Sequence, residues 1–358
     1  MKQEVLLSVL IVSLFLSGCH GEGDKLKYIN EFPGEEHLTG RSIEDVELFS
    51  KGNVSLVSLD TFLIIQRNEE PQFHVYNNIT YDLLAKFGTK GVGPYEFVWP
   101  ELLNQTDYDE SNDSPVICIY DYTRRKFTKL NILYAVNNQV DKASTEISIP
   151  GYDQFLTYFF FRDDELMVAT PETDSRFIIY KDSTKSYQAV PFIPSPDFPV
   201  SEELQPVVYR SASFVNKKLG LMVSAPLLLG EIDFFDLDGN HISSSIFSPG
   251  EDLKRAISNT GSNGKNFDPK YHIVQLHASD KYIFALNLNN YQSAIYENGS
   301  RSNQSILVFD WEGNPVKKFI LDRQYFIRSF AVDWENSRFF GYCSEEPEHN
   351  IIVYEFTL

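Results

Sequence analysis

The stretch ILVFDWEGNPVKKFI, residues 306–320, holds two short apolar runs on either side of a polar turn. The first run is rich in β-branched residues and ends in Phe309, and the turn that follows contains Gly, Asn and Pro. Runs of this composition on either side of such turn residues favour two antiparallel strands over a helix. We therefore predict a β-hairpin here.

The same unit recurs along the chain: an apolar run ends in an aromatic residue, a short polar turn follows, and a second run comes after it. The other copies are FHVYNNITYDLLAKF (73–87), RFIIYKDSTKSYQAV (176–190), EIDFFDLDGNHISSSIF (231–247) and IIVYEF (351–356). The aromatic residues that end the first runs are Tyr76, Tyr180, Phe235, Phe309 and Tyr354. The chain is therefore a repeat protein built from hairpins.

One copy is missing in the long gap between Tyr76 and Tyr180. The segment VICIYDYTRRKFTKL (116–130) fills the gap in either of two ways. Tyr120 can end the first strand of the hairpin, or the segment is shifted so that KFTKL (126–130) is that strand. We prefer the shift because it divides the gap more evenly, and both placements bring the number of repeats to six.

Two further apolar runs precede most of the hairpins, for example YHIVQLHA (271–278) and KYIFALNL (281–288). Six repeats of about four antiparallel strands indicate an all-β fold, a six-bladed β-propeller. The last repeat stops after its third strand, so we expect the N-terminal run SIEDVELFS (42–50) to close that blade and cover its edge. One propeller domain then spans residues 41–358. The alternative, a pair of β-sandwiches, would leave the six-fold count unexplained.

The balance of charge excludes some partners. The 358 residues include 31 Lys and Arg against 50 Asp and Glu, a net charge of −19. Such a chain repels the phosphates of nucleic acids and anionic lipid headgroups. We expect no nucleic acid partner and no direct adsorption to an anionic membrane.

The N-terminus reads MKQEVLLSVLIVSLFLSGC (1–19), an early Lys followed by an apolar stretch that is too short to span a bilayer. We interpret residues 1–18 as a signal peptide and residues 19–40, which are polar and contain Gly, as a flexible tether. The ending LSGC resembles the lipobox of bacterial lipoproteins, which implies that Cys19 carries the lipid. An ordinary secretory signal is the alternative. The expected location is the outer membrane, facing the periplasm or the cell surface.

A loop after the first hairpin suggests a family. KFGTKGVGPYEF (86–97) resembles the G-x-G-P-G-E-[FY] loop of the TolB-like six-bladed β-propeller lipoproteins of Gram-negative bacteria, with Tyr95 where that family commonly has a third Gly. The resemblance implies an extracytoplasmic binding or scaffold protein and supplies no catalytic residues. From the residues themselves, we expect Gly91 and Gly93 to permit a tight crossing between blades and Pro94 to stiffen it.

The sequence contains no HExxH or GxSxG motif. We expect no metal site and no cofactor. The alternative is calcium at the acidic run Asp107, Asp109, Glu110 and Asp113, although acids in a Ser/Asn-rich loop are usually solvated.

Propellers bind ligands at the mouth of the central channel, close to where the innermost strands begin. Aromatic and arginine side chains at such positions suit a sugar or an anionic glycan. The ligand-binding candidates chosen in this way are Trp99, Tyr152, Arg210, His272 and Arg328.

These observations favour a membrane-anchored, non-enzymatic module that binds a protein or glycan partner. The first alternative is a propeller enzyme, a polysaccharide lyase or hydrolase with its site at the channel mouth. A cluster of His272, Arg210 and a carboxylate would favour that alternative. The second is a purely structural subunit of an envelope complex, which would expose an apolar patch and no pocket.

Overall fold

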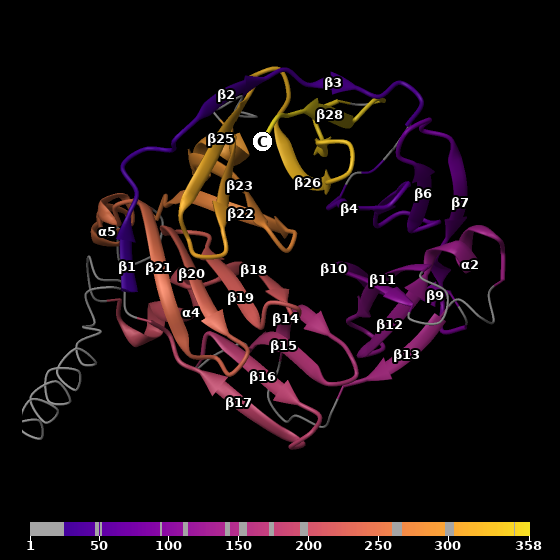
Figure 1. The fold of residues 1–358 in the computed structure, drawn as a ribbon, viewed down its shortest axis with the longest axis horizontal. Coiled ribbons are helices and arrows are strands. Elements are labelled where there is room, and N and C mark those ends of the chain that lie inside the picture. The colour runs from indigo at the N-terminus through magenta and orange to yellow at the C-terminus, as the bar shows by residue number, and fades with distance from the viewer. Residues whose placement is uncertain are drawn as a thin grey trace, which may run out of the picture.

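Six sheets are arranged in a ring around a common axis (Figure 1). The structure is a computed structural model, and it describes residues 25–46, 50, 52–93, 95–109, 114–139, 144–149, 156–171, 175–193, 200–259, 267–297, 304–346 and 348–358. Within each sheet, four strands are paired antiparallel in chain order from the axis outward, except that an N-terminal strand completes the last sheet. The fold is a six-bladed β-propeller, which confirms the predicted class.

The first three blades take their strands from consecutive segments. From the axis outward, blade 1 contains β4 (Ser55–Leu59), β5 (Phe62–Gln66), β6 (Phe73–Asn77) and β7 (Leu83–Phe87). Blade 2 contains β10 (Pro100–Asp109), β11 (Ser114–Asp121), β12 (Lys126–Asn131) and β13 (Ser144–Ser148). Blade 3 contains β14 (Leu156–Arg162), β15 (Leu166–Pro171), β16 (Phe177–Lys181) and β17 (Ser186–Val190).

The last three blades incorporate the N-terminal segment. Blade 4 contains β18 (Ser211–Asn216), β19 (Leu221–Pro226), β20 (Gly230–Asp236), β21 (His241–Ser248) and, outermost, β1 (Leu26–Tyr28). Blade 5 contains β22 (Lys270–Ala278), β23 (Tyr282–Tyr291), β24 (Ser305–Asp310), β25 (Pro315–Leu321) and, outermost, β2 (Glu35–Leu38). Blade 6 contains β26 (Ile327–Asp333), β27 (Arg338–Cys343), β28 (Ile351–Glu355) and β3 (Arg41–Ser42).

Short elements between blades are β8 (Thr89–Lys90) paired with β9 (Glu96–Phe97), the 3-10 helix η2 (Glu202–Leu204), α4 (Gln205–Val208) and α5 (Glu251–Ser258). Within blades 2 and 5, α2 (Ile132–Val136) and α6 (Gln292–Glu297) connect neighbouring strands. No helix in the described part of the chain is long and apolar enough to cross a membrane.

Blade 2 settles the two placements of the missing repeat. The segment KFTKL lies in β12, the third strand, and β12 pairs with the outermost strand β13. Tyr120 lies in β11, the second strand. The preferred shifted placement is therefore confirmed.

The N-terminal segment closes the ring, but with fewer residues than expected. On its open edge, β28 pairs with β3, where Arg41 lies opposite Val353 and Ser42 opposite Ile352. The prediction of a closing strand over residues 42–50 is correct in its partner and wrong in its extent. The backbone N–H of Ile43 still donates to the Ile351 carbonyl at 2.9 Å, but the chain turns away from the sheet at Glu44 and Asp45.

The predicted tether over residues 19–40 is also wrong in part. Strands β1 and β2 pair in parallel with the outer strands β21 and β25, so this segment belongs to the ring (Figure 1). The polar composition suggested a linker, but backbone hydrogen bonds to a sheet edge do not require apolar side chains. We call residues 25–42 the strap, because it runs along blades 4, 5 and 6.

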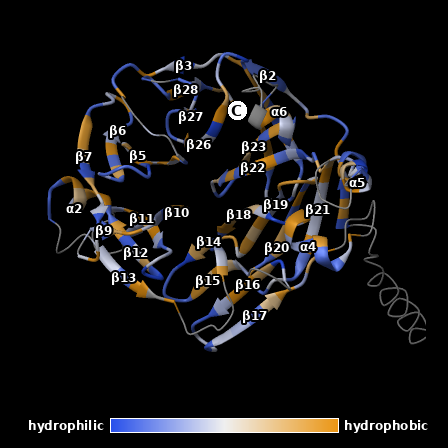
Figure 2. Ribbon diagram, turned by 180° about the vertical axis from the view of Figure 1, so that it is seen from behind, coloured by the Kyte–Doolittle hydropathy of each residue, from blue (hydrophilic) through white to orange (hydrophobic). Residues whose placement is uncertain are grey.

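The hydrophobic core lies between neighbouring blades. At the contact of blades 5 and 6, for example, the Phe284 ring lies 5.2 Å from the Phe356 ring and 4.9 Å from the Trp334 ring. Figure 2 shows hydrophobic residues along the strands and mostly hydrophilic loops. The abundant aromatic residues thus pack the faces of adjacent sheets against one another.

Candidate functional site

The candidate site is the mouth of the channel at which the innermost strands begin. Two adjoining cavities of about 370 and 450 Å³ lie there, and both are lined by Asn53 and Tyr158. A third cavity of about 200 Å³ also includes Tyr158 and continues along the innermost strands. Cavities of this size suit a small molecule or one group of a larger partner.

Two arginines line the first of these cavities. Arg210 precedes β18, its guanidinium carbon lies 4.6 Å from the centre of the Tyr158 ring, and its Nη2 donates to the Tyr158 hydroxyl. Arg328 is the second residue of β26, and its Nε donates to the Ser344 hydroxyl at 2.6 Å. These contacts orient two exposed cations at the mouth, where they can bind carboxylate, phosphate or sulfate groups.

Trp99 lines the second cavity, just before β10 begins. Its side chain is 66% exposed, which is unusual for so large an apolar group. Beside it, the Tyr122 hydroxyl donates to the Glu101 carboxylate and to the Thr157 carbonyl at 3.0 Å. The mouth therefore offers an aromatic surface next to polar acceptors.

Burial changes the acidity of this pair. Desolvation raises the pKa of the Glu101 carboxyl, and the hydrogen bond from Tyr122 opposes that rise in part. Desolvation and the adjacent Glu101 charge raise the pKa of Tyr122 well above its usual range. Tyr122 is thus neutral at physiological pH and acts as a hydrogen-bond donor.

The structure brings Trp99, Arg210 and Arg328 together at the mouth, as the sequence predicts. His272 is a correction. It lies in β22 but is only 3% exposed and lines a different cavity, while its neighbour Tyr271 lines the mouth. The pairing of β22 with β23 shifts register between Tyr271 and Ile273, so simple alternation of side chains fails there.

The remaining predicted residues lie elsewhere or outside the described residues. Cys19, Pro94 and Tyr152 fall outside them. Gly91 and Gly93 lie between β8 and β9, and Gly93 N donates to Glu96 Oε2 at 2.8 Å. Tyr95 adopts a φ of 58°, a left-handed conformation that favours glycine, which explains the preference for glycine at this position in the similar loop.

Sequence reasoning missed Tyr158, Tyr122 and Glu101. Tyr158 begins four consecutive aromatic residues in the run LTYFFFR, so no alternation marks the side chain that faces the axis. Glu101 lies in β10 and Tyr122 in the turn after β11, so the two residues meet only in the fold. An aromatic residue near the start of an innermost strand was the one usable signal.

Two expectations about chemistry can be compared with the geometry. His272 and Arg210 line different cavities, so the cluster that would favour an enzyme does not form between them. Within the part of the chain that the structure describes, no group of three or more His, Cys, Asp or Glu could hold a metal ion. Half of the acidic run proposed for calcium, Glu110 and Asp113, lies outside the described residues. Asp107 accepts a hydrogen bond from the backbone N–H of Tyr108 at 2.8 Å.

The fold and the site define a six-bladed propeller with a ligand-sized hollow at one channel mouth. The family model described as TolB-like 6-blade propeller-like matches residues 36–335, and the chain belongs to this family. No curated protein matches the sequence.

Two solved structures illustrate the comparison. A member of the DUF4221 family from Bacteroides vulgatus is similar with a TM-score of 0.57 at 13% identity, over 90% of this chain and 96% of that chain. The streptogramin B lyase structure has a TM-score of 0.45 at 9% identity, over 88% and 97% of the two chains. At 13% identity the likeness to the Bacteroides protein concerns the fold alone.

Proposed function

We propose that this protein is a lipoprotein of the bacterial envelope whose propeller binds a protein or glycan partner without catalysing a reaction. The sequence LSGC that ends at Cys19 supports a lipid anchor. Membership of the TolB-like family and the similar propeller from a Bacteroides species fit an envelope protein. We place it at the outer membrane, facing the periplasm or the cell surface.

The observation that carries the binding role is the exposed Trp99 at the rim of the hollow. Tryptophan and arginine are the residues most often central to binding energy, and here Trp99 shares one mouth with Arg210 and Arg328. An indole surface left 66% exposed to water is stabilised when a partner covers it. The ring of Trp99 also suits stacking against the apolar face of a sugar.

The anchor also limits where the propeller can lie. The strap begins at Lys25, six positions after Cys19 in the sequence. Six residues span at most about 20 Å even when fully extended. The outer edge of blade 4, to which β1 is paired, therefore stays near the membrane.

Binding is tested by thermal shift of a chain without residues 1–19 against a panel of oligosaccharides, with and without calcium. We expect one class to stabilise the protein by mass action and the effect to disappear in Trp99→Ala and Arg210→Ala. Tyr28→Ala is the matched control, because Tyr28 is a similarly exposed aromatic on β1, far from the mouth.

If no oligosaccharide acts, a pull-down from envelope extract with the same variants tests the protein partner. Capture that is lost in Trp99→Ala but kept in Tyr28→Ala supports the proposal. Equal capture by the unchanged protein and all three variants would contradict a role for the mouth. Cleavage of any oligosaccharide during the incubation would show an enzyme instead.

Anchoring is tested separately by fractionation of cells that produce Cys19→Ser. We expect the unchanged protein in the membrane fraction and the variant in the soluble fraction. Membrane retention of the variant would contradict attachment through Cys19.

A further inference from the structure

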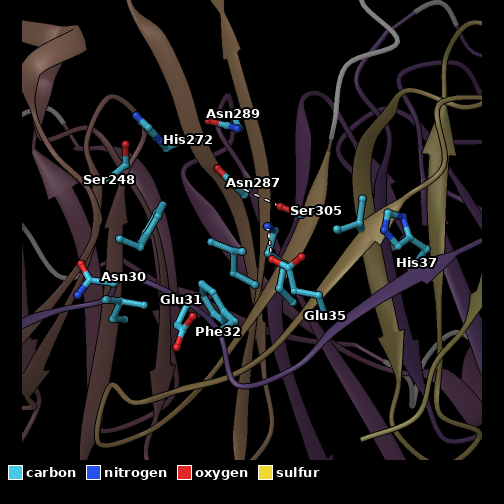
Figure 3. A pocket seen from close by; sticks show the side chains of 15 residues that line it. Asn30, Glu31, Phe32, Glu35, His37, Ser248, His272, Asn287, Asn289 and Ser305 are labelled. Atoms are coloured by element: carbon cyan, nitrogen blue, oxygen red, sulfur yellow. Dashed lines mark hydrogen bonds and ion pairs between the residues drawn. The ribbon is translucent and has the colours of Figure 1, made fainter.

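A second cavity, of about 520 Å³, lies between the strap and blades 4 and 5, apart from the channel mouth (Figure 3). Asn30, Glu31 and Phe32 of the strap form one side, together with Glu35 of β2. Strand β21 of blade 4 and strands β22 to β25 of blade 5 form the other sides. Between β1 and β2 the strap passes from blade 4 to blade 5 without following the edge of either sheet. This leaves room for the cavity.

The floor of the cavity is polar and buried. His272 is 3% exposed, Asn287 is 7% exposed and Ser305 is 3% exposed, and all three side chains line the cavity. Burying such polar groups without hydrogen bonds destabilises a protein. Each of these side chains therefore needs a hydrogen-bond partner.

Asn287 lacks one of those partners. Its Nδ2 donates to the Ser305 hydroxyl over a long 3.4 Å, and its Oδ1 is buried with no hydrogen-bond partner among the described residues. An unsatisfied buried acceptor destabilises the folded protein. A ligand hydroxyl that donates to this oxygen would remove the penalty.

The charges around the cavity exclude an anionic ligand. Lys318 is its cation, and its Nζ lies 2.6 Å from the Glu35 carboxylate, which neutralises it (Figure 3). Glu31 adds an exposed negative charge. Desolvation lowers the pKa of His272 to about 4, so its ring is uncharged at neutral pH and offers one donor and one acceptor.

The remaining lining supports a ligand with both polar edges and apolar faces. Phe32 and Phe247 are half-buried rings at the cavity, and Asn30 and Ser248 add an amide and a hydroxyl. Amides, hydroxyls and a neutral imidazole beside aromatic rings match the alternating hydroxyl groups and C–H faces of a sugar ring.

We propose that this cavity is a second binding site, which takes one neutral sugar residue between the strap and the buried floor formed by His272, Asn287 and Ser305. A sugar bound there contacts both the strap and blade 5. Its binding therefore stabilises the docked strap as well as the blades, through the same linkage that makes any ligand of the folded state stabilising.

The test is saturation-transfer difference NMR on the full chain, purified in a detergent that has no sugar headgroup. The probes are the methyl glycosides of glucose, galactose, mannose and N-acetylglucosamine at millimolar concentrations. We expect at least one to bind saturably and Asn287→Ala to weaken it by about tenfold, the loss of one buried hydrogen bond of about 1.4 kcal/mol.

Asn30→Ala serves as a second variant, because Asn30 is exposed on the strap and its replacement leaves the buried floor intact. We expect it to weaken the same glycoside. Trp99→Ala separates the two sites, since it alters only the channel mouth. Circular dichroism melts of each variant show whether the propeller is folded.

Binding that is weakened by Asn287→Ala and Asn30→Ala but kept in Trp99→Ala supports the proposal. Binding that is lost only in Trp99→Ala overturns it and assigns the sugar to the channel mouth. No saturable binding of any of the four glycosides also overturns it, whereas the proposed function would still be decided by its own oligosaccharide panel and pull-down.

Discussion

Arg176 and Asp233 form an ion pair across the boundary of blades 3 and 4, with Nη1 2.6 Å from Oδ2. Their side chains are 1% and 2% exposed. Arg176 also donates from Nη2 to the Ser224 hydroxyl at 3.2 Å, and Asp233 accepts from the Ser244 hydroxyl. The pair thus joins two blades inside their buried interface, where neither charge has access to water.

Removal of one partner should be far more costly than removal of both. We expect Arg176→Met to lower the free energy of unfolding by about 3–5 kcal/mol, because it leaves the Asp233 carboxylate buried and unpaired. The double variant Arg176→Met/Asp233→Leu should be more stable than Arg176→Met alone. Urea denaturation measures both, and a double variant less stable than the single one would contradict this account.

The closure of the ring depends on a close approach at Gly40. A Cβ atom there would lie 2.7 Å from both Ile352 Cγ2 and Tyr354 Cζ, atoms of β28. We expect Gly40→Ala to destabilise the protein by about 1–3 kcal/mol through overpacking. Gly34→Ala, in the same strap, is the control, since its nearest neighbour would be Lys317 Cγ at 3.9 Å. Equal thermal midpoints for the two variants would show that β3 does not need this close contact.

Stability should fall as the pH falls below neutral. Desolvation lowers the pKa of the buried His74, His272 and His277 to about 4 in each case. In the unfolded chain these groups titrate near 6.5, so unfolding takes up protons between the two values. Each histidine stabilises the fold fully above about pH 6.5, and the stabilisation is lost progressively towards pH 4.

His277→Gln isolates one of these contributions. Gln does not titrate, and its amide can still donate to the Phe330 carbonyl, which lies 2.6 Å from His277 Nε2. Between pH 7 and pH 5 we expect the stability of the variant to fall by about 2 kcal/mol less than that of the unchanged protein. Urea midpoints at the two pH values provide the measurement, and parallel falls would show that His277 keeps an ordinary pKa.

Calcium should not contribute to stability. Among the described residues no acidic cluster is suited to a metal, and acids in an exposed polar loop are usually solvated. We expect neither EGTA nor added calcium to change the thermal midpoint. A rise on calcium addition that Asp113→Asn abolishes would instead place an ion at the acidic run of residues 107–113.

The fold could be predicted because a propeller repeats one local pattern. Hairpins such as residues 306–320 show an apolar run, a turn and a second run, and their spacing revealed even the atypical copy at KFTKL. The strap could not be predicted in the same way. Residues 25–40 are joined to blades 4 and 5 by backbone hydrogen bonds, which leave no trace in side-chain composition.

The candidate site could be predicted only in part. Trp99, Arg210 and Arg328 come just before or at the start of innermost strands, a position that the repeat map locates. The position of His272 was predicted wrongly, because a shift of register in β22 places Tyr271 at the channel mouth instead. A shift of one residue exchanges the two faces of a strand, and single-chain periodicity does not detect it.

By itself, the sequence determined the class of fold, the number of blades and the blade that is left open at the C-terminus, because local strand and turn preferences specify each repeat. Only the tertiary structure decided which side chains share a cavity. The pairing of Arg210 with Tyr158 at the mouth joins two blades, and the cavity between Asn30 and Asn287 joins residues from opposite ends of the chain. Such contacts depend on how sheets pack and how strands are in register, and the physical forces that set them act between segments far apart in the sequence.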